Sequence, residues 1–248
     1  MSKKTNYSYI GIAFIILVFG IIFVPRIVDR INQGDITRQE SRSDYAGEKG
    51  KQATDLVFIK GENGNRRVPE FSFTNHNGKT ITNKDYLGKV YVIEFFFTTC
   101  PTICPVMNTN LVEVQNEFKD FENFGVASFT INPDYDTVSV LKDYATTYGI
   151  TNPNWHLMTG KKEAIYKLAN DGFYIYAAEN AAVEGGFEHS GNFALIDKNG
   201  FIRSRKDEFG NPIIYYNGIV TEKEQVNDDG QREQISILKE DIKKLLNE

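Results

Sequence analysis

Two cysteines four positions apart are the residues of this chain best suited to chemistry. Cys100 and Cys104 enclose the segment Cys-Pro-Thr-Ile-Cys, which follows an apolar run and precedes a helix-like pattern. They are the only cysteines among the 248 residues. A spacing of about one helical turn brings two thiols close enough to form a disulfide or to share a metal ion. The pair therefore predicts redox chemistry, metal binding or both.

The neighbouring prolines predict how the cysteines are presented. Pro105 has no N–H to bond back to residue 101, so a continuous helix from Pro101 is disfavoured. We expect a tight loop over residues 100–104, with Cys104 as the N-cap and Pro105 as the first helical residue. The positive end of the helix dipole is then expected to lower the pKa of the Cys104 thiol.

Three histidines are available as a third metal ligand. His76 lies in an Asn-His-Asn-Gly turn and His156 follows Trp155, so each has an ordinary structural role open to it. His189 lies in a glycine-rich segment that leads into an apolar run, and glycines let backbone approach a ligand closely. We therefore favour His189.

The donor types favour some metals over others. Two thiolates and one imidazole suit Cu(I) and can also hold Cu(II). A structural zinc site fits less well, because it takes four ligands. A pair of inert core cysteines is the remaining alternative, but two threonines and two prolines around the pair are unusual for a core.

Composition and charge exclude several classes of protein. A net charge of -5 and a pI near 5.4 lack the basic excess of nucleic-acid binders. Two cysteines are too few for a disulfide-built fold. The 18 Phe and 13 Tyr supply a large core for a folded domain.

The first 25 residues differ from the rest of the chain. After a short tail over residues 1–8, an uncharged run extends from Tyr9 to Val24, a little less than the roughly 20 residues that span a bilayer. We expect an uncleaved transmembrane anchor over residues 9–25, because no small-residue cleavage site follows the run. A cleaved signal peptide is the alternative, whereas a lipid-anchored lipoprotein would need a cysteine after the run.

The anchor sets an expected topology for the remainder. Lys3 and Lys4 precede it and favour a cytoplasmic N-terminus. Residues 26–55 are polar and are expected to form a linker. Residues 56–248 are then one folded domain on the far side of the membrane.

Strand-like and helix-like patterns alternate in that domain, which predicts an α/β fold. The expected strands are residues 71–74 and 79–81, joined as a hairpin, and then 90–97, 124–131, 173–176, 193–196 and 201–203. The expected helices are residues 105–118, 137–148, 161–170 and 235–245. The cysteines therefore follow a buried strand and precede a helix, which is where parallel sheets present ligands.

Two segments of the chain resemble the Sco/SenC family of copper-binding, thioredoxin-like proteins. FFFTTCPTICPVMN resembles the family's C-x3-C-P segment, and FEHSGNFALIDKNG resembles its histidine segment. The similarity extends over about residues 67–200. It implies that Cys100, Cys104 and His189 bind copper and that the two cysteines are a redox-active pair. It also implies a thioredoxin-like fold with a central mixed sheet, flanking helices, an added N-terminal hairpin and a single N-terminal transmembrane helix.

The resemblance implies a function as well. A Sco/SenC protein is expected to be a membrane-anchored copper metallochaperone with linked thiol–disulfide chemistry, acting in assembly of the copper A site of cytochrome c oxidase. Its partner is the copper A-bearing subunit or another copper or thiol client, on the periplasmic side of a bacterial-type inner membrane. Whether the protein is an enzyme stays open, since a metal-independent thiol–disulfide oxidoreductase and a redox or copper sensor are the alternatives. A thiol peroxidase is disfavoured, because Phe97 stands where that class has a threonine.

Two features depart from the family pattern. Asn132-Pro133 stands where the family usually has Asp-Pro, an acidic position expected to help present the site to partners. Residues 203–232 are longer and more polar than the usual join between the last hairpin and the last helix. We expect this insertion to be a solvent-facing excursion.

Overall fold

The computed structural model describes residues 17–20, 25, 56–61 and 64–248. Residues 17–20 and 25 are helical. The expected tail and linker lie outside the described residues, as does most of the expected anchor. Within the described part of the chain, no helix is long and apolar enough to cross a membrane. The transmembrane helix therefore stays a prediction.

Parallel strands form the centre of a mixed β-sheet. They are β6 (Val90–Phe96), β7 (Phe124–Thr130) and β8 (Trp155–Thr159). Every residue of β6 and β7 is buried, as is typical of strands covered on both faces. β11 (Asn192–Ile196) runs antiparallel beside β6. These strands provide the rigid base from which the cysteine loop leaves.

Shorter strands extend the sheet on both sides. The order across the sheet is β1-β12-β11-β6-β7-β8-β4-β5. The outer strands are β1 (Val57–Phe58), β12 (Ile202–Ser204), β4 (Ser72–Asn75) and β5 (Thr80–Thr82). The pairing of β4 with β5 confirms the expected hairpin. Two small hairpins lie outside this order: β2 (Lys60–Gly61) with β3 (Gly64–Asn65), and β9 (Ala177–Glu179) with β10 (Phe187–His189).

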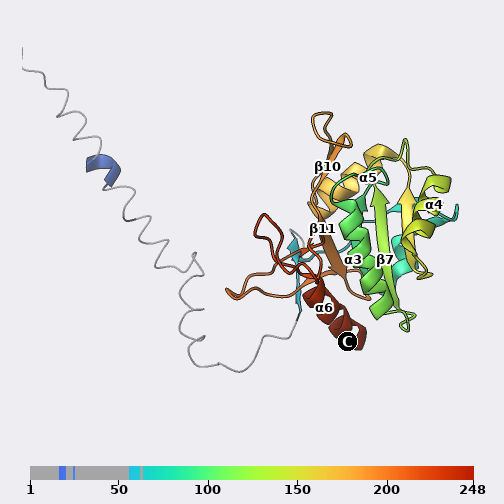
Figure 1. The fold of residues 1–248 in the computed structure, drawn as a ribbon. Helices are drawn as coiled ribbons and strands as arrows, with labels where there is room; N and C mark the ends of the chain where they lie inside the picture. Colours follow the sequence, from blue (N-terminus) through green and yellow to red (C-terminus); the bar gives the residue numbers. More distant parts are fainter. Residues whose placement is uncertain (1–16, 21–24, 26–55, 62–63) are drawn as a thin grey trace, which may run out of the picture. The chain divides into compact units, whose positions relative to one another are not determined.

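Three helices cover one face of the sheet. α3 (Cys104–Glu117) connects β6 to β7, and α4 (Val138–Tyr148) connects β7 to β8. Right-handed crossovers that step in the same direction place both helices on the same face, and α3 lies along β7 in Figure 1. The C-terminal helix α6 (Ile235–Asn247) packs against α3 and β6.

The opposite face is covered by the segment after β8. α5 (Lys162–Lys167) continues into a π-helical turn, η2 (Leu168–Phe173). Phe96 packs against Tyr144 of α4, whereas its neighbour Phe95 packs against Phe173. Because adjacent residues of a strand point to opposite faces, η2 lies on the face away from α4. A short 3-10 helix, η1 (Asn83–Tyr86), follows β5.

The expected strand over residues 173–176 is wrong. Phe173 belongs to η2, and Tyr174 has a left-handed backbone with φ of 53°, which interrupts an extended chain. The strand of this region, β9, begins at Ala177. β8 and β10 were not expected from the sequence. The helix expected over residues 161–170 is α5 together with most of η2.

The expectation for residues 203–232 is only partly right. Phe209 is 72% exposed in the turn between Lys206 and Pro212, and Val226 is 48% exposed at the bridge to Arg232 that closes a second turn. Between the turns, Tyr216 and Val220 are buried. β13 (Tyr216–Asn217) pairs with the beginning of β11. The middle of the insertion is therefore packed structure and not a solvent-facing excursion.

Candidate metal centre

The loop between β6 and α3 presents both cysteines at the carboxyl end of the central strand. Cys100 is 8% exposed and Cys104 is fully buried, and both are free thiols. The backbone N–H of Cys104 donates to Sγ of Cys100 at 3.5 Å. α3 begins at Cys104 with Ile103 as its N-cap, one residue earlier than expected. Pro105 still lies in the first turn, where its missing N–H costs no hydrogen bond.

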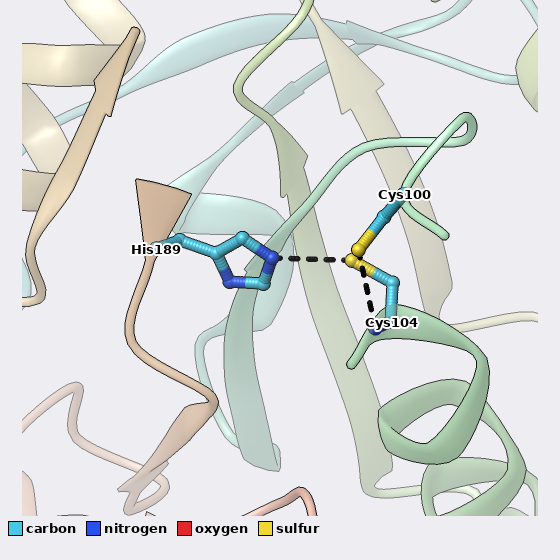
Figure 2. A group of neighbouring side chains, drawn as sticks. All are labelled: Cys100, Cys104 and His189. Carbon is cyan, nitrogen blue, oxygen red and sulfur yellow. Dashed lines mark hydrogen bonds between the residues drawn. The ribbon is translucent and has the colours of Figure 1, made fainter. Parts of the chain in front are cut away.

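His189 reaches the cysteines from a segment 85 residues further along the chain. It ends β10, and its Nε2 atom lies 3.2 Å from Sγ of Cys104. The ring also makes an edge contact with Phe97, with centroids 5.9 Å apart. Figure 2 shows the imidazole directed at the two sulfur atoms, with Cys100 on the loop and Cys104 on the first turn of the helix.

The three side chains form a set with the geometry of a small metal site. Nε2 or Nδ1 of His189 and the two Sγ atoms all lie within 4.8 Å of one another. No other group of three His, Cys, Asp or Glu side chains gathers in this way among the described residues. Two sulfurs and one nitrogen are a soft donor set, which suits Cu(I). The structure thus brings together the three residues singled out from the sequence.

The two thiols differ strongly in acidity. A hydrogen bond with the Cys104 side chain, helped by His189 and by backbone N–H groups, lowers the pKa of Cys100 to about 3, although burial opposes this. Burial raises the pKa of Cys104, and the adjacent Cys100 raises it further. The expectation of an acidic Cys104 is therefore wrong, because desolvation outweighs the helix dipole at this buried position.

Comparison with known proteins places the chain in a family. Residues 60–222 match the sequence model of the SCO1/SenC family. The chain belongs to the SCO1/SenC family. The SCO1 protein homolog of Bacillus subtilis strain 168 is 30% identical to it over 161 residues, which cover 64% of this chain and 81% of the relative.

Solved structures share the fold of this SCO1/SenC chain. BsSco, a member of the Sco family of cytochrome c oxidase assembly proteins in which a disulfide switch was identified, is 23% identical with a TM-score of 0.59, covering 79% of this chain and 98% of BsSco. Bradyrhizobium japonicum ScoI, solved with copper bound, is 22% identical with a TM-score of 0.53, covering 72% and 99% of the two chains. The SCO1/SenC chain therefore has the thioredoxin-like α/β fold of Sco proteins.

A buried carboxylate holds the cysteine loop of the SCO1/SenC chain. The Thr98 N–H donates to Oδ2 of Asp136 at 3.1 Å, and the hydroxyls of Thr98 and Thr130 also donate to this carboxyl group. Asp136 is fully buried, and desolvation raises its pKa against the effect of these hydrogen bonds. Sequence reasoning missed Asp136, because its partner Thr98 is 38 residues away.

A second buried carboxyl lies within the central strand. Glu94 on β6 accepts a hydrogen bond from Oγ of Ser128 at 2.5 Å, and Ser128 accepts one from the indole of Trp155 at 2.9 Å. Burial raises the pKa of Glu94 to about 7. The signal in the sequence was a single charged residue in the apolar run 90–97.

The other two histidines lie away from the cysteines. Nδ1 of His76 accepts a hydrogen bond from the backbone N–H of Leu157 at 3.2 Å, and Nδ1 of His156 lies 3.2 Å from the amide nitrogen of Asn75. Burial lowers the pKa of both imidazoles, that of His156 to about 4. Each has the structural role that the sequence suggested, next to the β4–β5 hairpin.

Proposed function

We propose that this SCO1/SenC chain is a membrane-anchored copper metallochaperone whose cysteine pair also performs thiol–disulfide chemistry. Cys100, Cys104 and His189 hold the copper ion as cargo. The protein acts in assembly of the copper A site of cytochrome c oxidase, and its client is the copper A-bearing subunit or another copper or thiol protein.

One observation carries this proposal: donor atoms from two distant segments converge within 4.8 Å. A disulfide exchange site needs only the two cysteines. The additional imidazole, directed at Sγ of Cys104, completes a three-coordinate soft site. Copper bound to ScoI of Bradyrhizobium japonicum supports the choice of metal.

The redox state of the cysteines gates the release of copper. Oxidation joins Sγ of Cys100 to Sγ of Cys104, removes two electrons, and consumes both thiolate ligands. The electrons pass to a client disulfide, which becomes two thiols. BsSco is a member of the Sco family of cytochrome c oxidase assembly proteins, and a disulfide switch was identified in it. That switch supports a role for disulfide formation in the present chain.

The acidities of the two thiols indicate which cysteine attacks the client disulfide first. Cys100, with its lowered pKa, is the thiolate that attacks the client disulfide and forms a mixed disulfide. That step removes the negative charge of Cys100, which is one cause of the raised pKa of Cys104. Cys104 then loses its proton more readily, attacks the sulfur of Cys100 and releases the reduced client.

Copper stoichiometry in two redox states tests the proposal. The fully reduced protein is expected to bind one copper ion, and the fully oxidised protein is expected to bind little. Equal copper content in both states would contradict the three-ligand site. The thiol titre measured in parallel verifies that the redox states were reached.

A metal-independent thiol–disulfide oxidoreductase is the second candidate. The lowered pKa of Cys100 favours it, because this acidity suits a nucleophile whether or not a metal binds. A reduced protein that reduces model disulfides rapidly but binds no copper would replace the first candidate with this one.

The cellular location follows from the N-terminal sequence. We propose an uncleaved anchor at residues 9–25 that leaves the N-terminus in the cytoplasm and the domain in the periplasm. Reporter fusions at the C-terminus test this orientation: an enzyme active only in the periplasm is expected to function there, and activity of a cytoplasmic reporter would overturn it.

A further inference from the structure

The middle of the insertion after β12 is bonded to the backbone that follows His189. Asn217 pairs with Asn192, and Tyr216 pairs with Phe193. The N–H of Gly218 donates to the carbonyl oxygen of Gly191 at 2.7 Å. β10, which carries His189, belongs to a separate two-stranded sheet. The insertion therefore fixes the connection through which His189 is joined to the central sheet.

The same segment is attached to the helix that begins at Cys104. The side-chain amide of Asn110, on α3, donates to the carbonyl oxygens of Gly218 at 2.9 Å and Val220 at 3.1 Å. The hydroxyl of Tyr216 donates to Asp241 of α6 at 2.8 Å. Asn110, Tyr216 and Asp241 are all buried, so these bonds are protected from water and resist local opening.

Ile219 lies at the point where the two ligand-bearing segments meet. A Cβ atom added to Gly191 would lie 2.0 Å from Cγ2 of Ile219 and 3.6 Å from Cδ1 of Ile103. Ile103 directly precedes Cys104, and Gly191 follows His189 by two residues. Both isoleucines are partly buried and pack against the core. The side chain of Ile219 therefore fills the space beside Gly191, and the side chain of Ile103 borders the same point.

We propose that residues 215–220 form a brace that sets the position of His189 relative to the cysteines, and that Ile219 is its positioning residue. This inference rests on the proposed copper site. The brace matters for a metal ion, which needs all three ligands at fixed distances. It does not matter for the disulfide, because Cys100 and Cys104 lie together at the junction of β6 and α3, whose backbone is held through Thr98.

A pair of substitutions at positions 191 and 219 tests the brace. Ile219→Ala removes the packing atoms, and Gly191→Ala creates a clash at 2.0 Å with the Ile219 side chain. In the double variant the new Cβ at position 191 lies 3.4 Å from Cβ of residue 219 and 3.6 Å from Ile103, which are ordinary packing distances. Val226→Ala is the matched control, because Val226 lies in the same insertion and is 48% exposed.

The readouts are Cu(I) affinity by competition with a chromophoric chelator, the Cu(II)–thiolate absorption band and the potential of the Cys100–Cys104 disulfide. We expect each single variant to bind copper about tenfold more weakly, in line with the effects of outer-shell changes at metal sites. The double variant is expected to recover most of this loss. The disulfide potential is expected to stay at the wild-type value throughout, and Val226→Ala to match wild type in every measurement.

The outcomes distinguish a failure of the proposed brace from a failure of the proposed copper site. Wild-type copper affinity in both single variants would overturn the brace while leaving the proposed function intact. A wild-type protein that binds no copper would overturn the proposed function. A double variant weaker than either single variant, or a disulfide potential that moves with copper affinity, would show general damage and would also overturn the brace. Should Ile219→Ala not fold, Ile219→Leu, which lacks the Cγ2 branch that a Cβ at position 191 would meet but keeps the side-chain volume, replaces it in the comparison.

Discussion

Sγ of Cys104 lies 3.2 Å from Nε2 of His189, although 85 residues separate them in the chain. Cys104 begins α3, whereas His189 ends a hairpin that is not part of the central sheet. The turn of that hairpin packs closely on the cysteine loop, since a Cβ on Gly185 would lie 3.0 Å from Pro101 and 3.2 Å from Phe97. The metal-ligating side chains therefore come together only in the folded domain. Copper binding is expected to stabilise the folded domain for that reason.

Removal of the imidazole is expected to separate copper binding from thiol chemistry. His189→Ala deletes the nitrogen donor, so copper affinity is expected to fall by at least about tenfold. The cysteines keep their loop and are expected to form their disulfide as before. Copper competition and a disulfide reduction assay measure the two effects.

The other histidines provide the controls for this experiment. His76→Ala and His156→Ala remove imidazoles that bond near the β4–β5 hairpin and lie outside the three-residue group. Both variants are expected to bind copper like the wild type. Wild-type affinity in His189→Ala would instead point to the oxidoreductase.

Alkylation is expected to distinguish the two thiols. With its pKa lowered to about 3, Cys100 is a thiolate at pH 5, whereas the raised pKa keeps Cys104 protonated. Iodoacetamide at pH 5 is therefore expected to modify Cys100 first, as located by tandem mass spectrometry. Cys100→Ser is expected to abolish this reaction. Preferential modification of Cys104 would reverse the assigned order of attack.

Loss of the buried carboxylate beside the loop is expected to destabilise the fold. Asp136→Ala leaves the donors of Thr98 and Thr130 without their acceptor, at a cost of about 3 kcal/mol in the free energy of unfolding. Urea titration measures this loss. Asp134→Ala is the matched control, because that side chain is 79% exposed and forms a surface ion pair with Lys162; its cost is expected to be under about 0.5 kcal/mol. Equal losses would remove the assigned role of Asp136.

Glu94 is expected to make stability fall as pH rises. The pKa of Glu94 is about 7 in the folded chain against an ordinary 4.5, so the folded state holds the proton more tightly. Both states are protonated well below pH 4.5; above it the unfolded chain ionises first and stability is lost until about pH 7. Between pH 5 and 8 this loss is about 2–3 kcal/mol.

Glu94→Gln is expected to remove that pH-dependent loss while keeping the shape of the side chain. The measurement is urea unfolding at pH 5 and pH 8 for both proteins. Glu113→Gln, at an exposed position of α3, is the control and is expected to retain the wild-type dependence. An unchanged pH dependence in Glu94→Gln would show that the carboxyl group is not the cause.

Local patterns predicted elements well where burial is uniform along a strand or periodic along a helix. The apolar runs of β6 and β7 and the periodic pattern of α6 are each visible within one window of residues. The aromatic run over residues 173–176 also looks like a strand, but Phe173 is held in η2 through its packing on Phe95. A tertiary contact overrode the local preference there.

The sequence by itself determined the cysteine pair and its setting, because Cys100 and Cys104 are neighbours along the chain after a buried strand. It identified His189 only through its glycine-rich surroundings and the family resemblance. The tertiary structure decided which thiol is acidic, since burial of Cys104 depends on the helices and strands packed around it. It also decided that Asp136 and Ile219 lie against the site, because contacts between distant segments exist only once the sheet, the hairpin and the insertion have assembled.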